Sequence, residues 1–167
     1  MDLDLGTIIV GIICTAICVV PFLLMGKSRK KKDQQKLQSL TSTANTHEGR
    51  ITSYEFCGNF AIAIDNKKGL VFFHKEINGE TVLEAGIDLN HIQECRLQST
   101  SISVTKNKEN YKMIERLELC FTPLSKGEKE MKWELFSREN NRQLSGELQA
   151  GEKWSKLINQ QIHVKVW

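Results

Sequence analysis

Two short apolar segments joined by a polar turn run from Phe60 to Gly79, with the sequence FAIAIDNKKGLVFFHKEING. Short runs of apolar and β-branched residues bounded by turn residues are typical of β-strands. The closing pair Asn78-Gly79 favours a two-residue hairpin turn, because both residues tolerate a positive φ. This stretch therefore predicts an antiparallel sheet, in which the segment Thr81–Leu89 pairs back on the strand before it.

The same pattern continues on both sides of that stretch. Leu117, Leu119 and Phe121 alternate with polar residues, as expected of a half-buried strand. The predicted strands are Arg50–Phe56, Phe60–Ile64, Leu70–Lys75, Thr81–Leu89, Ile92–Leu97, Ser101–Thr105, Met113–Thr122 and Met131–Phe136. The fold class expected for this part of the chain is a mainly antiparallel β domain of about seven strands.

One amphipathic helix is predicted to close the domain. After the polar turn Arg138–Arg142, apolar residues recur mostly at spacings of three and four, from Leu144 to Ile162. Gly151 lies within this stretch and weakens a helix by about 1 kcal/mol relative to alanine. The helix is therefore expected to begin later than Ser145.

The segment GEKWSKLINQQI, residues 151–162, resembles the closing helix of the pleckstrin-homology superfold. In that family a tryptophan of the C-terminal helix packs into the end of an open barrel of antiparallel strands. The matching position here is Trp154, followed one turn later by Leu157 and Ile158. The resemblance covers Arg50 to Ile162, extends to membrane-anchored bacterial proteins with this fold, and leaves a strand-rich sandwich as the alternative fold.

The first hairpin loop bears on what the resemblance implies about ligands. Phosphoinositide-binding members of the family carry basic residues in and around this loop, whereas the candidate loop here is Cys57-Gly58-Asn59. The resemblance therefore implies a protein-binding use, in which a partner peptide pairs with an exposed strand or lies beside the closing helix.

An uncharged apolar segment of 19 residues precedes the β domain, from Thr7 to Met25, TIIVGIICTAICVVPFLLM. A helix of this length spans about 28 Å, which matches the hydrocarbon core of a bilayer. Asp2 and Asp4 precede it and a basic cluster follows, which is the reverse of the order in a cleavable signal peptide. Because basic flanks stay in the cytoplasm, the N-terminus is predicted outside and everything after Lys27 in the cytosol.

These predictions divide the chain into four parts. They are a short extracytoplasmic N-terminus (1–6), a transmembrane helix (7–25), a basic juxtamembrane segment with a linker (26–49), and a cytosolic β domain with its C-terminal helix (50–167). The linker is rich in Gln, Ser and Thr. Its first part, KKKDQQKLQSL (residues 30–40), is compatible with a helix that continues out of the membrane, and the chain beyond Leu40 is expected to be flexible.

The basic cluster beside the apolar segment provides candidates for contact with anionic lipid headgroups. Each Lys or Arg near such a surface contributes about 1 kcal/mol of binding. The cluster consists of Lys27, Arg29, Lys30, Lys31 and Lys32. The alternative is that these residues set only the membrane topology.

The charge of the predicted domain excludes one class of partner. From Arg50 onward the chain carries 17 basic and 16 acidic side chains, so this part is close to neutral. A nucleic-acid-binding domain would gather basic residues on one face. We therefore expect a membrane and a protein as partners, and no nucleic acid.

The five cysteines do not form a disulfide framework. Cys14 and Cys18 lie in the apolar segment, which leaves Cys57, Cys95 and Cys120 as an odd set without close spacing. Free thiols suit a reducing compartment. They also leave a cysteine-based redox sensor or enzyme as an alternative function.

No sequence motif for catalysis, a cofactor or a metal is found. The chain has no Gly-rich phosphate loop, no G-x-S-x-G and no H-E-x-x-H. His91 and Cys95 are expected to share a strand face, but a structural zinc site needs four ligands and no second close pair exists. Large aromatic residues are expected in the core, with Trp167 at the membrane interface or the barrel edge. The core candidates are Phe72, Phe73, Phe121, Trp133 and Trp154.

The function expected from these features is that of a single-pass membrane protein. It would present a small non-catalytic binding module to the cytosolic face, for recruitment of a protein partner or interaction with the membrane surface. A structural subunit of a membrane complex is the alternative, with Gly11 and Thr15 as a close-packing face of the membrane helix.

Overall fold

The computed structural model describes residues 33–106, 109–141 and 143–164 of the chain. The chain divides into two compact units, residues 1–38 and residues 39–167, and the β domain lies in the second unit. The predicted extracytoplasmic segment, the transmembrane helix, the basic cluster from Lys27 to Lys32 and Trp167 lie outside the described residues. Within the described residues, no helix is long and apolar enough to cross a membrane.

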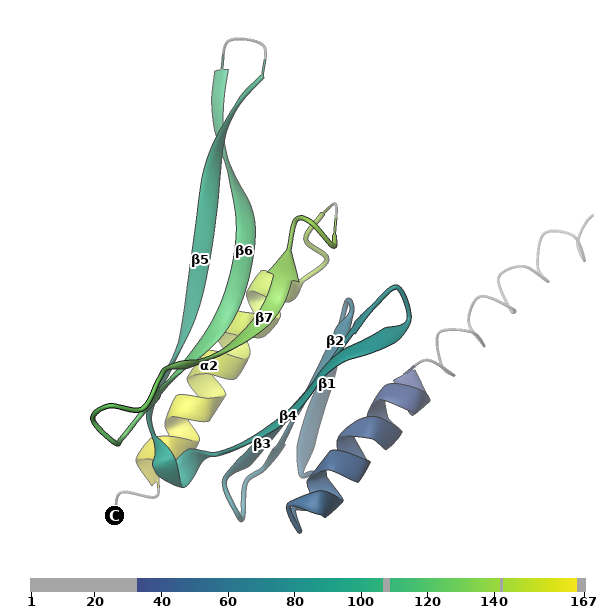
Figure 1. Ribbon diagram of the computed structural model, residues 1–167, viewed down its shortest axis with the longest axis vertical. Helices are drawn as coiled ribbons and strands as arrows, with labels where there is room; N and C mark the ends of the chain where they lie inside the picture. The colour runs from purple at the N-terminus through teal and green to yellow at the C-terminus, as the bar shows by residue number, and fades with distance from the viewer. Residues whose placement is uncertain (1–32, 107–108, 142, 165–167) are drawn as a thin grey trace, which may run out of the picture. The chain divides into compact units, whose positions relative to one another are not determined.

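The first sheet contains four antiparallel strands in sequence order (Figure 1). They are β1 (Ser53–Cys57), β2 (Phe60–Asp65), β3 (Leu70–Ile77) and β4 (Glu80–Asp88). The turn between β3 and β4 confirms the predicted hairpin, because φ is 54° at Asn78 and 86° at Gly79. Only residues that accept this left-handed backbone allow so short a connection.

The second sheet contains three antiparallel strands and follows a short 3-10 helix, η1 (Leu89–His91). The strands are β5 (Ile92–Lys106), β6 (Glu109–Pro123) and β7 (Met131–Ser137). The two predicted strands Ile92–Leu97 and Ser101–Thr105 are one continuous strand, because the polar residues between them stay extended against β6. β7 pairs with β6 only from Arg116 to Phe121, so the β5–β6 hairpin continues beyond it (Figure 1).

The C-terminal helix α2 (Glu147–Val164) packs against the second sheet and shares a core with both sheets. Its start confirms the expectation that the helix begins after Ser145. Trp154 is buried in this core together with Phe73, Phe121 and Trp133, as predicted. The described residues thus form a mainly antiparallel β domain of two sheets and one C-terminal helix. They show no strand pairing between the sheets, so the strands do not close into a barrel.

The outer face of the first sheet is also covered, which corrects the prediction for the linker. Residues 33–46 are helical, and Leu40 and Ala44 are buried against Phe72 and two alanines of β2, Ala61 and Ala63. The expectation of flexible chain beyond Leu40 is therefore wrong. The small alanine side chains let the helix approach the sheet, so β2 is buried on both faces.

Candidate binding cleft at the end of the C-terminal helix

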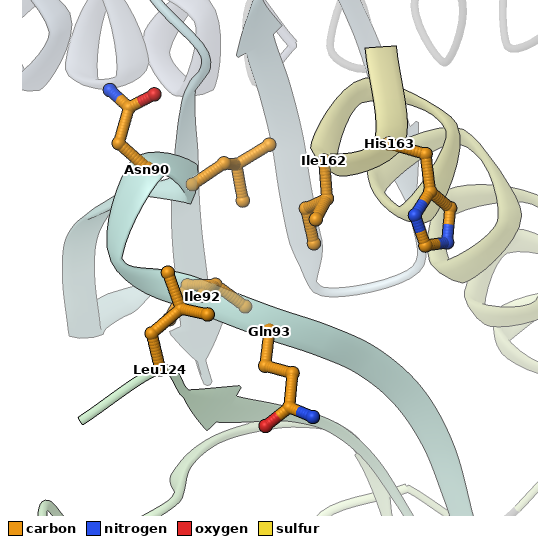
Figure 2. A pocket seen from close by; sticks show the side chains of 7 residues that line it. Asn90, Ile92, Gln93, Leu124, Ile162 and His163 are labelled. Carbon is orange, nitrogen blue, oxygen red and sulfur yellow. The ribbon is translucent and has the colours of Figure 1, made fainter. Parts of the chain in front are cut away.

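A cleft of about 310 Å³ lies where η1, the start of β5 and the end of α2 meet. Figure 2 shows the labelled side chains of this cleft, which come from parts of the chain far apart in sequence. Its lining residues are Leu89, Asn90, Ile92, Gln93, Leu124, Ile162 and His163. We call this hollow the helix-end cleft.

The floor of the helix-end cleft is apolar and buried. Leu89 and Ile92 are each 2% exposed and Ile162 is 7% exposed, so all three also belong to the core. On the rim, Leu124 is 57% exposed. Its backbone N–H donates a 2.9 Å hydrogen bond to the carbonyl of His91, which holds the rim against η1.

The remaining rim of the cleft is polar. Asn90, Gln93 and His163 are exposed, and the Asp88 carboxylate caps η1 by accepting a 2.9 Å hydrogen bond from the backbone N–H of Asn90. A concave apolar floor with a few polar groups around it is the usual form of a recognition site. The helix-end cleft is therefore suited to hold one bulky apolar side chain of a ligand, with hydrogen bonding at its edge.

A second hollow of about 350 Å³ lies near the C-terminal end of β7. It is lined by Met113, Ile114, Phe136, Arg138, Gln143 and Leu144. Leu144 is 38% exposed and Met113 is 37% exposed, so much of the apolar lining reaches solvent. Arg138 contacts Met113 within this lining, with Nη1 3.2 Å from Sδ.

The closing helix is fastened to the first sheet through Glu55 of β1. Glu55 Oε2 accepts hydrogen bonds from Nε1 of Trp154 at 2.7 Å and from Nζ of Lys153 at 2.8 Å. At the β1–β2 turn, a Cβ on Gly58 would lie 2.6 Å from Oε1 of the buried Glu147. The first hairpin loop thus abuts a carboxylate of α2 and has no room for a larger side chain.

The three cysteines of the domain do not form a reactive group. Burial, with weaker contributions from Cys120 and Glu94, raises the pKa of the Cys95 thiol to about 12. Burial also raises the pKa of Cys120, whose Sγ lies 3.3 Å from Oε1 of Gln98. Cysteine chemistry needs the thiolate, so these shifts disfavour both residues as nucleophiles. Cys57 is only partly buried.

The expected common face for His91 and Cys95 is wrong. His91 ends η1 and its side chain is 79% exposed, whereas Cys95 points into the core and is 1% exposed. The 3-10 turn interrupts the strand alternation on which the expectation depended. Within the described residues, no three His, Cys, Asp or Glu side chains gather in a group that could hold a metal ion.

A buried imidazole on β3 joins three elements of the second unit. His74 is 2% exposed, and its Nδ1 lies 3.1 Å from Oε1 of Glu84 and 3.0 Å from Oγ of Ser39. Its Nε2 lies 3.1 Å from Oε1 of Glu76. Because the two nitrogens point in opposite directions, the two carboxylates cannot share one ion with the ring, and the cluster serves as a polar link between β3, β4 and the helical segment 39–46.

A buried ion pair connects the two sheets. Nζ of Lys75 on β3 lies 2.5 Å from Oε1 of Glu134 on β7, and the lysine side chain is 4% exposed. Nε of Arg116 lies 3.5 Å from the second carboxylate oxygen of Glu134. The sequence offered no signal for this contact, because Lys75 and Glu134 are 59 positions apart.

Comparison with known proteins yields no relative. No protein-family model matches the chain, and no curated protein and no solved structure is similar enough to count as a match.

Proposed function

We propose that this chain is a membrane-anchored, non-catalytic binding module of the pleckstrin-homology-like class. In this proposal the uncharged segment Thr7–Met25 is a single transmembrane helix and the β domain faces the cytosol. The helix-end cleft is the site at which a protein partner is recruited. The basic cluster from Lys27 to Lys32 lies in the proposal beside the anionic inner leaflet.

The order of the elements supports the assignment to that class. A four-stranded sheet, a three-stranded sheet and a closing helix with a buried tryptophan follow one another in the order of the superfold. The tryptophan is Trp154, at the position suggested by the sequence resemblance. The absence of closure between the sheets agrees with an open barrel.

The first hairpin loop favours a protein ligand over a phosphoinositide. A lipid headgroup would need cations at this loop, but Glu147 places a buried carboxylate against Gly58 there. A phosphate beside that carboxylate would meet like charge in a poorly solvated place. The apolar helix-end cleft has no such conflict with a peptide side chain.

The observation that carries the proposal is the exposed apolar side chain of Leu124 above a buried apolar floor. Leu124 remains 57% exposed although Leu89 and Ile92 below it are buried. Hot spots of protein interfaces are large side chains that fill well-packed apolar pockets. A partner that inserts one large apolar residue would bury Leu124 and fill the cleft without moving the core.

Site-specific photocrosslinking in cells tests the proposal. A photoreactive residue in place of Asn90, on the rim of the cleft, is expected to capture a defined cellular protein. Leu124→Glu in the same chain should abolish that product, because a carboxylate on the apolar rim must lose water when the partner binds. Leu144→Glu, at the second hollow, is the matched control and should leave it intact.

Two results would contradict this proposal. A crosslinking pattern that Leu124→Glu does not change would show that the cleft is not the recruiting site. Proximity labelling with an enzyme fused to the C-terminus tests the orientation independently. If it marked only exported proteins, the domain would not face the cytosol.

A further inference from the structure

Strand β5 forms one edge of the second sheet, and its first part is covered by the closing helix. The Asn159 side chain accepts a 2.8 Å hydrogen bond from the backbone N–H of Cys95 and donates one of 2.6 Å to its carbonyl. The Ser155 hydroxyl donates to the same carbonyl at 3.0 Å. These side chains take the place of a neighbouring strand, which is one way in which proteins protect a sheet edge.

Among the residues that the structure describes, no side chain covers the later part of the same edge in this way. Residues Gln98 to Val104 have the sequence QSTSISV, without a charge, a proline or a glycine. The side chains from Gln98 to Ser101 are exposed, as is that of Ser103. Each of the other edge strands carries charges: Glu55 on β1, Glu80 and Glu84 on β4, and Lys132 and Glu134 on β7.

The direction of the free backbone groups follows from Cys95. Since its N–H and C=O point away from β6 toward α2, every second residue after it also points its backbone groups outward. These residues include Ser99, Ser101 and Ser103. The irregularity beside Ser101 does not disturb this alternation, because the extra residue belongs to β6.

We propose that this free edge pairs with the same edge of a second copy of the chain. The two β5 strands run antiparallel about a two-fold axis at Ser101, the midpoint of the segment Gln98–Val104. Ser99 then lies opposite Ser103, and Thr100 lies opposite Ile102. Outward-facing groups meet in hydrogen-bonded pairs, and the three-stranded sheets join into one sheet of six strands.

The composition of the segment favours a second copy as the occupant. A two-fold axis places each strand opposite itself, which brings like charges together in most sequences, but this segment has none. The β-branched pair Thr100 and Ile102 is a favourable cross-strand neighbour. A charged foreign strand would find no complementary charge along this edge.

The face of the hairpin adds apolar surface beside the pairing line. Ile102 is paired with Met113, and Val104 with Tyr111, so these four side chains share one face of the ribbon. Met113 is 37% exposed and Tyr111 is 49% exposed. The two-fold axis would place two such faces side by side on the same side of the joined sheet.

Disulfide crosslinking of the full chain in its native membrane tests both pairing and register. Hydrogen-bonded antiparallel partners have Cα atoms about 5.5 Å apart, within the range for a disulfide. Ser101→Cys alone is therefore expected to give a covalent dimer on mild oxidation, and so is a mixture of Ser99→Cys and Ser103→Cys chains. Ser99→Cys alone should give none beyond the unsubstituted chain, since its copies lie about 13 Å apart along the strand.

A second measurement tests self-association without introduced cysteines. Two differently tagged copies of the chain should co-purify from membranes. Ser101→Lys should abolish this, because it places like charges opposite each other at the axis. Thr81→Lys on the edge strand β4 is the matched control and should co-purify as the unsubstituted chain does.

The proposal is wrong if Ser99→Cys crosslinks as well as Ser101→Cys, or if neither exceeds the unsubstituted chain. It is also wrong if Ser101→Lys leaves co-purification intact. Another outcome would assign the edge to a foreign strand. In that case the unsubstituted chain does not associate with itself, but it crosslinks to a different protein, and Ser101→Lys loses that crosslink. All these outcomes are independent of Leu124 and of the helix-end cleft.

Discussion

At the residue scale, Asp65 shows how a buried carboxylate organises a connection. Its Oδ2 accepts a 2.7 Å hydrogen bond from the backbone N–H of Arg50, and its Oδ1 accepts from the N–H groups of Lys67 and Lys68 at 2.9 and 3.1 Å. Burial alone would raise the pKa of Asp65, but these hydrogen bonds together with the charge of Lys68 outweigh it and lower the pKa. One carboxylate thus holds both the entry into β1 and the β2–β3 turn.

Asp65→Asn is expected to destabilise the domain near neutral pH by about 1–3 kcal/mol, because three backbone N–H groups lose a charged acceptor. The wild-type carboxylate has a lower pKa when folded than the ordinary value of 3.8. Its contribution is therefore complete above that value and disappears as the pH falls through the folded pKa. Thermal unfolding of the wild-type and Asp65→Asn full chains, from neutral pH into acid, measures the difference in stability between them. This difference should become smaller in acid. A difference that does not change with pH would contradict the charge-based account.

Gly151 shows that a helix-weakening residue can be required by packing. On propensity alone, alanine at this position would stabilise α2 by about 1 kcal/mol. A Cβ at Gly151 would lie 2.7 Å from Cδ1 of Leu97 and 2.9 Å from Cδ1 of Leu135. The glycine therefore sets how closely the helix approaches β5 and β7.

Gly151→Ala is expected to lower the free energy of unfolding by about 1–3 kcal/mol, because overpacking outweighs the gain in helix propensity. Denaturant unfolding of the full chain measures this difference. Lys156→Ala, on the exposed side of the same helix, serves as the control and should change stability by no more than about 0.5 kcal/mol. A stabilised Gly151→Ala chain would mean that the helix can shift away from the sheet.

At the scale of elements, the strands and their turns could be predicted because their signals are local. The alternation around Leu119 and the pair Asn78-Gly79 act over a few residues, and each is found in the structure as expected. The middle of β5, between the predicted strands Ile92–Leu97 and Ser101–Thr105, was missed, because Ser99 and Thr100 carry no apolar signal and extend only by pairing with β6. Apolar periodicity indicates which residues are buried, so it gives little signal for a strand whose side chains are exposed.

The helical residues beyond Leu40, up to residue 46, were missed for a different reason. The apolar side of this helical segment is narrow, with Leu40 and Ala44 one turn apart among polar residues. Its partner surface is made of Ala61 and Ala63. In the sequence these small residues alternate with the larger residues of β2 and give no sign that they form a packing surface. The packing is evident only when both faces of β2 are considered together.

Leu40→Ala is expected to cost about 2–5 kcal/mol, because the side chain is fully buried between the helix and the first sheet. The measurement is thermal unfolding of the full chain, followed by a signal from Trp133 or Trp154 in the core. Ser42→Ala, at an exposed position of the same segment, is the control. Equal stability of the two variants would show that the segment is not part of the cooperative unit.

At the scale of the whole domain, the helix-end cleft lies at the ends of helices and strands that are distant in sequence, and the free β5 edge lies beyond the part of the strand that the closing helix covers. The cleft combines η1, β5, α2 and Leu124, which follows β6, and no stretch of sequence contains that combination. The residue types that line the cleft are common in proteins, and only the fold brings these residues together. The candidate site was therefore beyond sequence reasoning.

The Lys75–Glu134 pair is the contact that tests how the two sheets depend on each other. Glu134→Gln should leave a buried ammonium group without its carboxylate and destabilise the domain by on the order of 3 kcal/mol, reduced by the partial exposure of Glu134. Lys75→Met combined with Glu134→Gln should recover most of this loss, because an apolar side chain of similar length then fills the space. Denaturant unfolding of both single variants and the double variant measures their coupling. Additive losses would mean that the ion pair contributes nothing to the docking of the sheets.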